Sequence, residues 1–327
     1  MKNAAIGVDI GGTSVKMGVV GPNGRIVCRS NFPTGRHAKK SDVLDSLYEH
    51  SRSLTAQAKK AGFRVTGVGI GAPGPIDVER GFVYSFPNIH GWENTPLRKI
   101  LEKRLRLPVR IDNDANAMAL GETLFGAGRG AKNTIALTLG TGVGGGIVID
   151  GKLFHGPTYS AAEIGHIVLN EEGPQCGCGN RGCIETYVGN GYFVREVRSR
   201  LAAGEKSVLK RWIEEDGREL TPYLVWQAAK KGDGFAKKFW WETGLHLGNA
   251  LVGLVNVFNP EKIILGGGVA QDKPHLLDSV TRTIKKKAFP IAARSVKVVP
   301  AALGVDAGLI GAAALVLAAD PKRGRRA

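Results

Sequence analysis

The chain has 327 residues, enough for two domains with substantial hydrophobic cores. Its 43% hydrophobic and 23% charged residues and its 46 glycines are typical of a loop-rich α/β protein and exclude a disordered one. Lysine and arginine outnumber acids 45 to 29, a net charge of +16, but these basic residues are dispersed, so we expect no nucleic-acid partner. Because no leader and no apolar run of spanning length is seen, we expect a cytoplasmic protein without membrane contact.

The N-terminal part of the sequence predicts strands joined by tight turns. Residues 4–10 form an apolar run that is typical of a buried strand. Two more strands should flank the Pro-Asn-Gly sequence at 22–24, a strong hairpin signal. Apolar residues at helical spacing then predict a helix over 41–61, with Ser41 as its N-cap.

The remaining elements repeat one pattern. Residues 65–75 predict a buried strand that runs into a glycine-proline loop, and residues 109–122 predict a strand, a loop and a helix. The later segments again alternate strands, glycine turns and helices: a strand, turn, strand and hairpin over 133–156, a long helix over 235–257, a strand and turn over 261–269, and a strand, loop and helix from 296 onward.

Two related halves, each a hairpin followed by a βαβ unit, predict an α/β fold of two lobes with a central cleft. We expect a small N-terminal α/β lobe at residues 1–116, which the C-terminal helix at about 305–320 joins, and a large α/β lobe at residues 117–304.

Two glycine turns predict phosphate binding. DIGGTSVK (9–16) and LGTGVGGG (139–146) each follow an apolar strand and combine threonine with glycine. Without Cβ atoms, backbone N–H groups can approach phosphate oxygens, and threonine hydroxyls can add donors. Asp9, at a strand end, can hold Mg²⁺ directly or through water. The residues that we expect at the phosphates are Gly11, Gly12, Thr13, Thr141 and Gly142.

A third glycine run, Gly266–Gly268, follows an apolar strand. Gly266, Gly267 and Gly268 can let a flat adenine ring lie against the backbone. A tight strand-to-helix turn with no ligand is the equally weighted alternative.

IDNDANA (111–117) places two acids at a strand end. A carboxylate beside a cleft can accept the proton of an alcohol that attacks phosphorus. Asp114 is the better base because the helix that follows it would hold its backbone firm. The alternative is that Asp112 or Asp114 only caps this helix.

Three of the four cysteines fall within CGCGNRGCIE (176–185). The order His166-x9-Cys176-x-Cys178-x4-Cys183 supplies three thiolates and an imidazole, the ligand set of a closed structural zinc site. The zinc would brace two segments that carry Glu163 and Glu185, which can both accept hydrogen bonds from a polyhydroxylated ligand. His166 can offer its second ring nitrogen to the same ligand.

Together, AEIGH, CGCGNRGCIE, DIGGT, NDANA and LGTGVGGG resemble the ROK kinases (repressor, open reading frame, kinase) of the actin-like ATPase superfamily, from residue 4 to about 318. The resemblance implies a duplicated, ribonuclease H-like fold. Within the family, GAPGPID (71–77) and FPNIHGWENTPL (86–97) are most similar to bacterial ATP-dependent glucokinases. In TYSAAEIGH, Ala162 stands where the family leads us to expect glycine.

By this resemblance Asp114 is the catalytic base, and the zinc ligands are His166, Cys176, Cys178 and Cys183. The resemblance also implies that the residues of the two glycine turns above bind the phosphates of the nucleotide. The implied sugar ligands are Gly74, Asn88, Asn113, Asp114, Glu163, His166 and Glu185.

The expected activity is transfer of the γ-phosphoryl group of MgATP to the 6-hydroxyl of glucose, by a homodimer or higher homo-oligomer with structural Zn²⁺. One alternative is another hexose (N-acetylmannosamine, N-acetylglucosamine, mannose or fructose) or polyphosphate as donor. The others are an inactive sugar-sensing regulator, which an intact Asp114 disfavours, and a zinc-stapled binding module without ATP.

Overall fold

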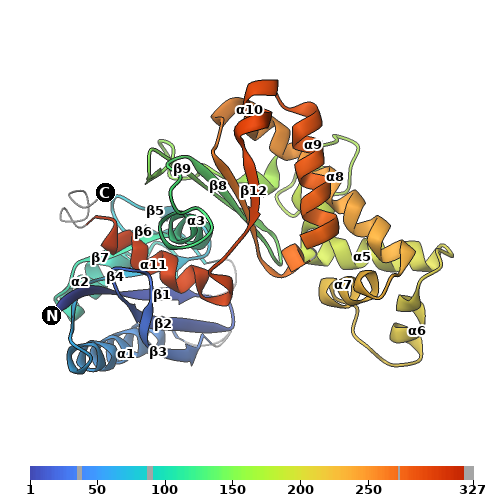
Figure 1. The fold of residues 1–327 in the computed structure, drawn as a ribbon. Helices are drawn as coiled ribbons and strands as arrows, with labels where there is room; N and C mark the ends of the chain where they lie inside the picture. Colours follow the sequence, from blue (N-terminus) through green and yellow to red (C-terminus); the bar gives the residue numbers. More distant parts are fainter. Residues whose placement is uncertain (35–38, 87–90, 272, 320–327) are drawn as a thin grey trace. The chain divides into compact units, whose positions relative to one another are not determined.

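The computed structural model describes residues 1–34, 39–86, 91–271 and 273–319. They form two compact units (Figure 1). The first unit contains Met1–Lys132, Gly146–Ala162 and the chain from Ala302 onward, and the second contains Asn133–Gly145 and Glu163–Ala301. The lobe boundary expected near residue 116 stays a prediction.

The first sheet has five strands in the order β3-β2-β1-β4-β7. Strand β1 pairs antiparallel with β2 and parallel with β4, β2 pairs antiparallel with β3, and β4 pairs parallel with β7. The bounds of the strands are β1 Lys2–Ile10, β2 Ser14–Val20, β3 Ile26–Pro33, β4 Phe63–Ala72 and β7 Val109–Asn113, and a small hairpin adds β5 Ile76–Asp77 and β6 Phe82–Val83.

The second sheet repeats this order as β10-β9-β8-β11-β12. Strand β11 pairs parallel with both β8 and β12, as β4 does with β1 and β7, and β10 pairs antiparallel with β9. The strands are β8 Thr134–Leu139, β9 Val143–Ile149, β10 Lys152–Leu153, β11 Lys262–Gly266 and β12 Lys297–Pro300. This shared order confirms the predicted α/β fold built from two related halves.

Helices follow the strands in both halves (Figure 1). The first half contains α1 Lys40–Lys60, α2 Leu97–Leu105 and α3 Asp114–Phe125. The second contains α4 Glu185–Val188, α5 Asn190–Ala202, α6 Val208–Glu214, α7 Pro222–Lys230, α8 Gly234–Phe258, α9 Asp278–Lys287, α10 Pro290–Ser295 and α11 Ala307–Leu317, with short helical turns η1 Ile164–His166, η2 Gly268–Gln271, η3 Lys273–Leu277 and η4 Gly304–Asp306.

Local sequence signals account for most element ends. Asp150 and Gly151 both adopt positive φ (49° and 76°), as a two-residue hairpin turn between β9 and β10 requires. Asn259 ends α8 in the left-handed conformation, one residue before Pro260. The prediction of Ser41 as N-cap of α1 is wrong, because the helix begins at Lys40 and the Ser41 hydroxyl donates to Asp42 (2.9 Å).

Helix α11 packs on the first sheet through glycines (Figure 1). A Cβ atom at Gly7 of β1 would lie 2.0 Å from the Leu309 carbonyl oxygen, and one at Gly69 of β4 would lie 1.8 Å from that of Ala312. Gly311 of α11 similarly faces the backbone of Ala117 in α3 at 2.0 Å. These four elements, β1, β4, α3 and α11, therefore approach at backbone contact, where a methyl group has no room.

Small residues also set the helix crossing in the second unit. A Cβ at Gly248 of α8 would lie 2.7 Å from the Cβ of Thr283 in α9, and Gly244 meets Ser279 in the same way at 2.6 Å. Trp240 and Phe193 are fully buried beside this crossing and contact each other at 4.7 Å between ring centroids. Within the part of the chain that the structure describes, the helices are too short or too polar for a membrane span.

We expect Gly69→Ala to destabilise the protein by at least about 2 kcal/mol, because overpacking against the Ala312 backbone forces β4 and α11 apart. Gly253→Ala is the matched control. Gly253 lies exposed inside α8, toward its C-terminal end, with nothing within 4 Å of an added Cβ, so alanine should stabilise the helix by about 0.5–1 kcal/mol. Urea unfolding of both variants measures the difference. Equal stabilities would contradict the proposed close packing.

Candidate functional site

The turn from β7 into α3 carries the predicted base. Asn113 is the N-cap of α3, since its side-chain oxygen accepts hydrogen bonds from the N–H groups of Ala115 (2.9 Å) and Asn116 (3.4 Å). The alternative that Asp112 or Asp114 caps this helix is therefore wrong. Asp114 is the first helical residue, and its carboxylate accepts from the Ala115 N–H at 2.8 Å.

Asp112 is buried directly behind this turn, with 1% of its surface exposed. One of its oxygens accepts from the Asn113 N–H (2.8 Å) and from the Asn116 side-chain amide (3.0 Å). The other contacts His155 Nε2 at 2.7 Å. Both carboxylate oxygens are thus satisfied, as a buried charge requires. The sequence did not reveal the His155 partner, because it lies 43 positions away.

Asp9, at the end of β1, lies in the same unit and interacts electrostatically with Asp114. Burial raises the pKa of Asp114, partly opposed by its hydrogen bond to Ala115. Burial and then the charge of Asp114 raise the pKa of Asp9 to about 6, against the opposing effect of Lys16. The site therefore concentrates negative charge that a bound cation would relieve.

The first glycine turn lies beside Asp9 and is fixed by backbone contacts. The Gly11 N–H donates to the Ser14 carbonyl (3.0 Å), and the fully buried Thr34 donates to the carbonyls of Gly11 (2.9 Å) and Thr13 (3.1 Å). The N–H of Gly11 is therefore already engaged. Gly12 is partly exposed and Thr13 is exposed, so they are the residues of the turn that can face a phosphate.

The second glycine turn lies against Glu185. The Val143 N–H donates to the Glu185 carboxylate (2.9 Å), and a Cβ at Gly142 would lie 2.4 Å from the same oxygen. Thr141 is exposed at the tip of the turn. Strand β9 begins at Val143, so the turn leads back into a strand as predicted.

The third glycine run has a clear structural role. Gly267 adopts φ 92°, and a Cβ there would lie 2.3 Å from the Leu139 carbonyl oxygen. The tight-turn interpretation therefore holds at Gly267. Gly268 and Thr141 also line a common cavity of about 210 Å³, together with Asn190 and Tyr223. Sequence reasoning missed Asn190 and Tyr223, because no motif marks the helices that carry them.

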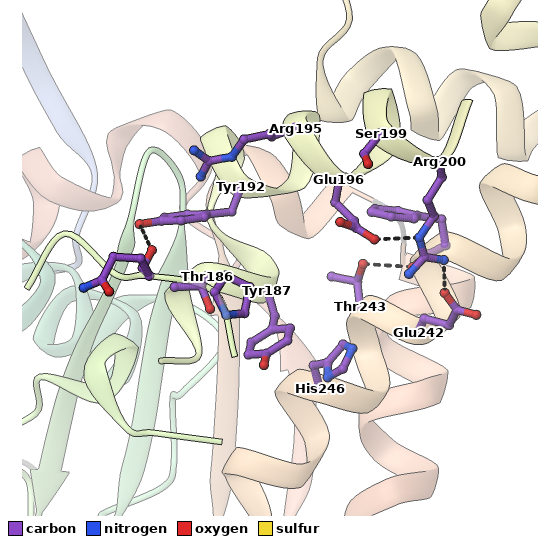
Figure 2. Close-up of a pocket in the computed structure, with 13 residues that line it drawn as sticks. Thr186, Tyr187, Tyr192, Arg195, Glu196, Ser199, Arg200, Glu242, Thr243 and His246 are labelled. Atoms are coloured by element: carbon purple, nitrogen blue, oxygen red, sulfur yellow. Dashed lines mark hydrogen bonds and ion pairs between the residues drawn. The ribbon is translucent and has the colours of Figure 1, made fainter. Parts of the chain in front are cut away.

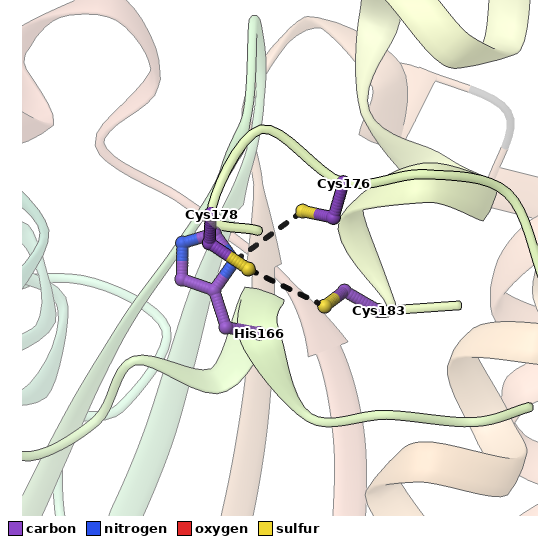
Figure 3. Close-up of side chains that lie close together, drawn as sticks. All are labelled: His166, Cys176, Cys178 and Cys183. Carbon is purple, nitrogen blue, oxygen red and sulfur yellow. Dashed lines mark hydrogen bonds between the residues drawn. The ribbon is translucent and has the colours of Figure 1, made fainter. Parts of the chain in front are cut away.

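Four side chains of the second unit converge as predicted for a metal centre (Figure 3). The ligand atoms of His166, Cys176, Cys178 and Cys183 all lie within 4.8 Å of one another. Cys176 Sγ lies 3.7 Å from His166 Nδ1, and the sulfurs of Cys178 and Cys183 lie 3.7 Å apart.

These separations fit a tetrahedral ion. Zinc–sulfur bonds of about 2.3 Å place two thiolates of one tetrahedron about 3.8 Å apart. A disulfide would need about 2.05 Å, so these cysteines are free thiols. Since His166 faces the sulfurs with Nδ1, its Nε2 is the nitrogen left for another partner.

The remaining predicted sugar ligands are placed as follows. Gly74 (φ 89°) accepts a weak hydrogen bond from the Asn113 side-chain amide at 3.5 Å, so these two residues lie together in the first unit. Glu163 is exposed at the start of the longer segment of the second unit, Glu163–Ala301, beside the turn that carries His166. Glu185 also lies near the metal cluster, 3.9 Å from Cys176 Sγ. Asn88 lies outside the described residues.

Ala162, which precedes Glu163, adopts φ 69°. This left-handed conformation explains why glycine is expected at this position, because a side chain costs about 1–2 kcal/mol there.

A cavity of about 510 Å³ in the second unit contains none of the predicted site residues (Figure 2). Its walls include Tyr187 stacked on His246 (4.5 Å between centroids) and Arg200 paired with Glu196 and Glu242. Sequence reasoning did not anticipate it, because its lining is spread over α4, α5 and α8.

The duplicated α/β fold, the two glycine turns and the Cys₃His cluster define a sugar-kinase-like member of a known family. The chain matches the ROK family over residues 5–319 and belongs to that family.

Two of its relatives are glucokinases. The chain is 39% identical to the glucokinase of Halalkalibacterium halodurans, covering 95% of this chain and 94% of the relative. It is also similar to the structure of a ROK family glucokinase from Streptomyces griseus in complex with glucose and AMPPNP (TM-score 0.77, 37% identity, covering 95% and 98%).

A third similarity is to a regulator. The structure of a ROK family transcriptional regulator, a homologue of the Escherichia coli Mlc protein, matches with a TM-score of 0.85 and 29% identity, covering 96% of this chain and 78% of the regulator.

We expect Asp9→Asn to stabilise the ligand-free protein at neutral pH. The folded-state pKa of Asp9 is raised from 3.8 to about 6. The ionised carboxylate therefore lowers the free energy of unfolding by about 2–3 kcal/mol above about pH 6, and this effect disappears below pH 3.8. The melting temperature of the variant should therefore exceed that of the wild type at pH 7, and the gap should close as the pH falls from 6 to 4. Asp216→Asn, at an exposed loop residue, is the control and should show no such gap.

Proposed function

We propose that this chain is an ATP-dependent glucokinase, which transfers the γ-phosphoryl group of MgATP to the 6-hydroxyl of glucose. The single observation that carries the proposal is the half-buried Asp114 at the first position of α3, with a raised pKa and Asp9 beside it. The similarity to glucokinases over 95% of the chain supports glucose as the sugar.

Asp114 acts as the general base. It accepts the proton of the 6-hydroxyl as the sugar oxygen forms its bond to the γ-phosphorus and the bond to the β-γ bridging oxygen breaks, releasing ADP. A carboxylate with a raised pKa is a stronger proton acceptor than an ordinary aspartate. The cap at Asn113 fixes the backbone that carries it.

We assign the sugar and the nucleotide to the residues that the sequence predicted. Glu163, His166 and Glu185 bind sugar hydroxyls, together with Gly74, Asn88 and Asn113. The two glycine turns and Gly266–Gly268 bind ATP. Asp9 is the residue suited to Mg²⁺, because its carboxylate lies where negative charge accumulates. Mg²⁺ would neutralise the phosphate charge when bound.

We further propose that the Cys₃His cluster holds structural Zn²⁺. Its donor set and 3.7 Å separations suit a closed tetrahedral site, and such a site keeps no position for water. The ion would fix the loop that ends at Cys183, two residues before Glu185. We also propose a cytoplasmic homodimer or higher oligomer, whose subunit has a small lobe at residues 1–116, joined by the C-terminal helix, and a large lobe at residues 117–304.

We expect Asp114→Asn to lower kcat by about 10²- to 10⁴-fold with little change in the dissociation constant for glucose, because the amide cannot accept the proton. A coupled ADP assay and calorimetry measure the two quantities. Glu261→Gln, well away from Asp114 in sequence and in the other unit, is the control and should keep full turnover. A variant Asp114→Asn that kept most of its kcat would overturn the assignment of the base.

The wild-type protein decides the substrate in the same assay. Glucose with ATP should give the highest kcat/KM in a panel that includes mannose, fructose, N-acetylglucosamine and N-acetylmannosamine, with polyphosphate as the rival donor. Turnover of another hexose alone would replace glucose. No turnover, with sugar-dependent binding to operator DNA, would favour a regulator, as the similarity to the transcriptional regulator would allow.

We expect about one zinc ion per chain in the purified protein, and its loss in Cys183→Ser. Losing a ligand should destabilise the fold by several kcal/mol, on the order of 4, and raise the glucose KM, because metal binding is coupled to loop folding. Elemental analysis and thermal unfolding measure both effects. Cys28→Ser, at a cysteine of the first unit outside the cluster, should keep its zinc. Zinc-free wild-type protein with full stability would contradict the metal site.

A further inference from the structure

His155 contacts the segment that carries the base, although no motif marks it. It follows β10, and its Nε2 lies 2.7 Å from the carboxylate of the buried Asp112. Asp112 in turn accepts hydrogen bonds from the Asn113 N–H and the Asn116 side chain, which belong to the turn that begins α3. His155 is therefore connected through Asp112, by two hydrogen bonds in sequence, to Asn113 and to Asn116 in the turn that carries Asp114.

The surroundings of His155 hold its ring in place. The neighbouring Phe154 N–H donates to the Ile147 carbonyl of β9 (2.8 Å), and the His155 carbonyl accepts from the Ala161 N–H (3.0 Å). The imidazole also meets the ring of Tyr159 edge-on, at 6.2 Å between centroids. With 22% of its side chain exposed, His155 is fixed on a strand end and a closed loop rather than on a free surface.

The carboxylate of Asp112 depends on this donor. Its side chain is 2% exposed, and His155 is the partner of one of its two oxygens. Without that partner one oxygen of the buried carboxylate would lack a hydrogen bond, and the carboxylate would turn toward another donor. That rotation would weaken its hydrogen bonds to Asn113 and Asn116. The turn that positions Asp114 would then lose its support from behind.

We propose that His155 is a positioning residue for phosphoryl transfer: its ring N–H donates to Asp112 and so holds the turn that aims Asp114 at the sugar hydroxyl. The inference rests on the proposed role of Asp114 as base. The hydrogen bond to Asp112 also raises the pKa of His155, although burial opposes this effect. The raised pKa favours the imidazolium form, in which Nε2 carries a proton and donates.

Three substitutions of His155 distinguish a role as hydrogen-bond donor at Nε2 from a role as a space-filling side chain. In His155→Gln the side-chain amide reaches the position of Nε2 and can still donate to Asp112. In His155→Asn the amide is too short, and in His155→Ala it is absent. His50→Ala is the matched control, because His50 is another part-buried histidine of the first unit, hydrogen-bonded to Ser30 and packed on Phe32.

We expect His155→Ala and His155→Asn to lower kcat by about 10- to 100-fold, since a small misplacement of a reacting group costs rates of this order. The KM for glucose should change less than kcat does, because Glu163, His166 and Glu185 are untouched and Asn113 is the proposed sugar ligand that shares the turn with Asp114. His155→Gln should recover most of the rate, and His50→Ala should keep it. A full rate in His155→Ala, an equal loss in the Gln and Ala variants, a change confined to KM, or an equal loss in His50→Ala would each overturn the proposal.

Hydrogen exchange tests the same contact without turnover. The amides of Asn113, Ala115 and Asn116 should exchange faster in His155→Ala and at the wild-type rate in His155→Gln. Unchanged exchange in His155→Ala would show that the turn does not depend on His155. If the wild-type protein phosphorylates no hexose, the proposed function fails on that result alone, and the exchange rates still decide whether His155 supports the turn.

Discussion

The buried carboxylate of Asp112 is the constraint on which the site in the first unit depends. It lies at the end of β7, and its two oxygens join a strand end, a helix start and the loop after β10. A charge buried this deeply is tolerated only when its hydrogen bonds are complete, so these three segments are held in one arrangement. That arrangement determines the position of Asp114, although Asp114 itself makes none of these contacts.

The repeated strand order explains why glycine turns occur twice. Strands β1 and β8 occupy equivalent central positions in their sheets, and each is followed by a turn and a returning strand. The two turns have nonetheless acquired different supports. Thr34 holds the first through backbone carbonyls, whereas the Glu185 carboxylate holds the second. Glu185 thereby connects the second turn with the cysteine cluster, and one side chain serves both features of that unit.

The sequence predicted those features that depend on neighbours along the chain. The strands, the hairpin at Asp150 and the Cys₃His cluster follow from local spacing, and the structure confirms them. Contacts between distant residues were out of reach, because no local pattern encodes them: His155 with Asp112 is an example. The N-cap of α3 was missed for another reason. Asp112, Asn113 and Asp114 are all good capping residues, and only the backbone geometry selects Asn113.

The packing of α11 on β1 and β4 joins the two ends of the chain in one unit. Residues 307–317 cover a sheet whose first strand begins at Lys2, about 300 positions earlier. The sheet is complete once β7 ends at Asn113, so at roughly 5–20 residues per second on the ribosome its face is exposed for on the order of 10–40 s before α11 is made. The second unit needs no residue beyond Ala301, so it can complete its fold first during synthesis. Nascent chains stalled before residue 307 would therefore expose the glycine-lined face of the first sheet to chaperones.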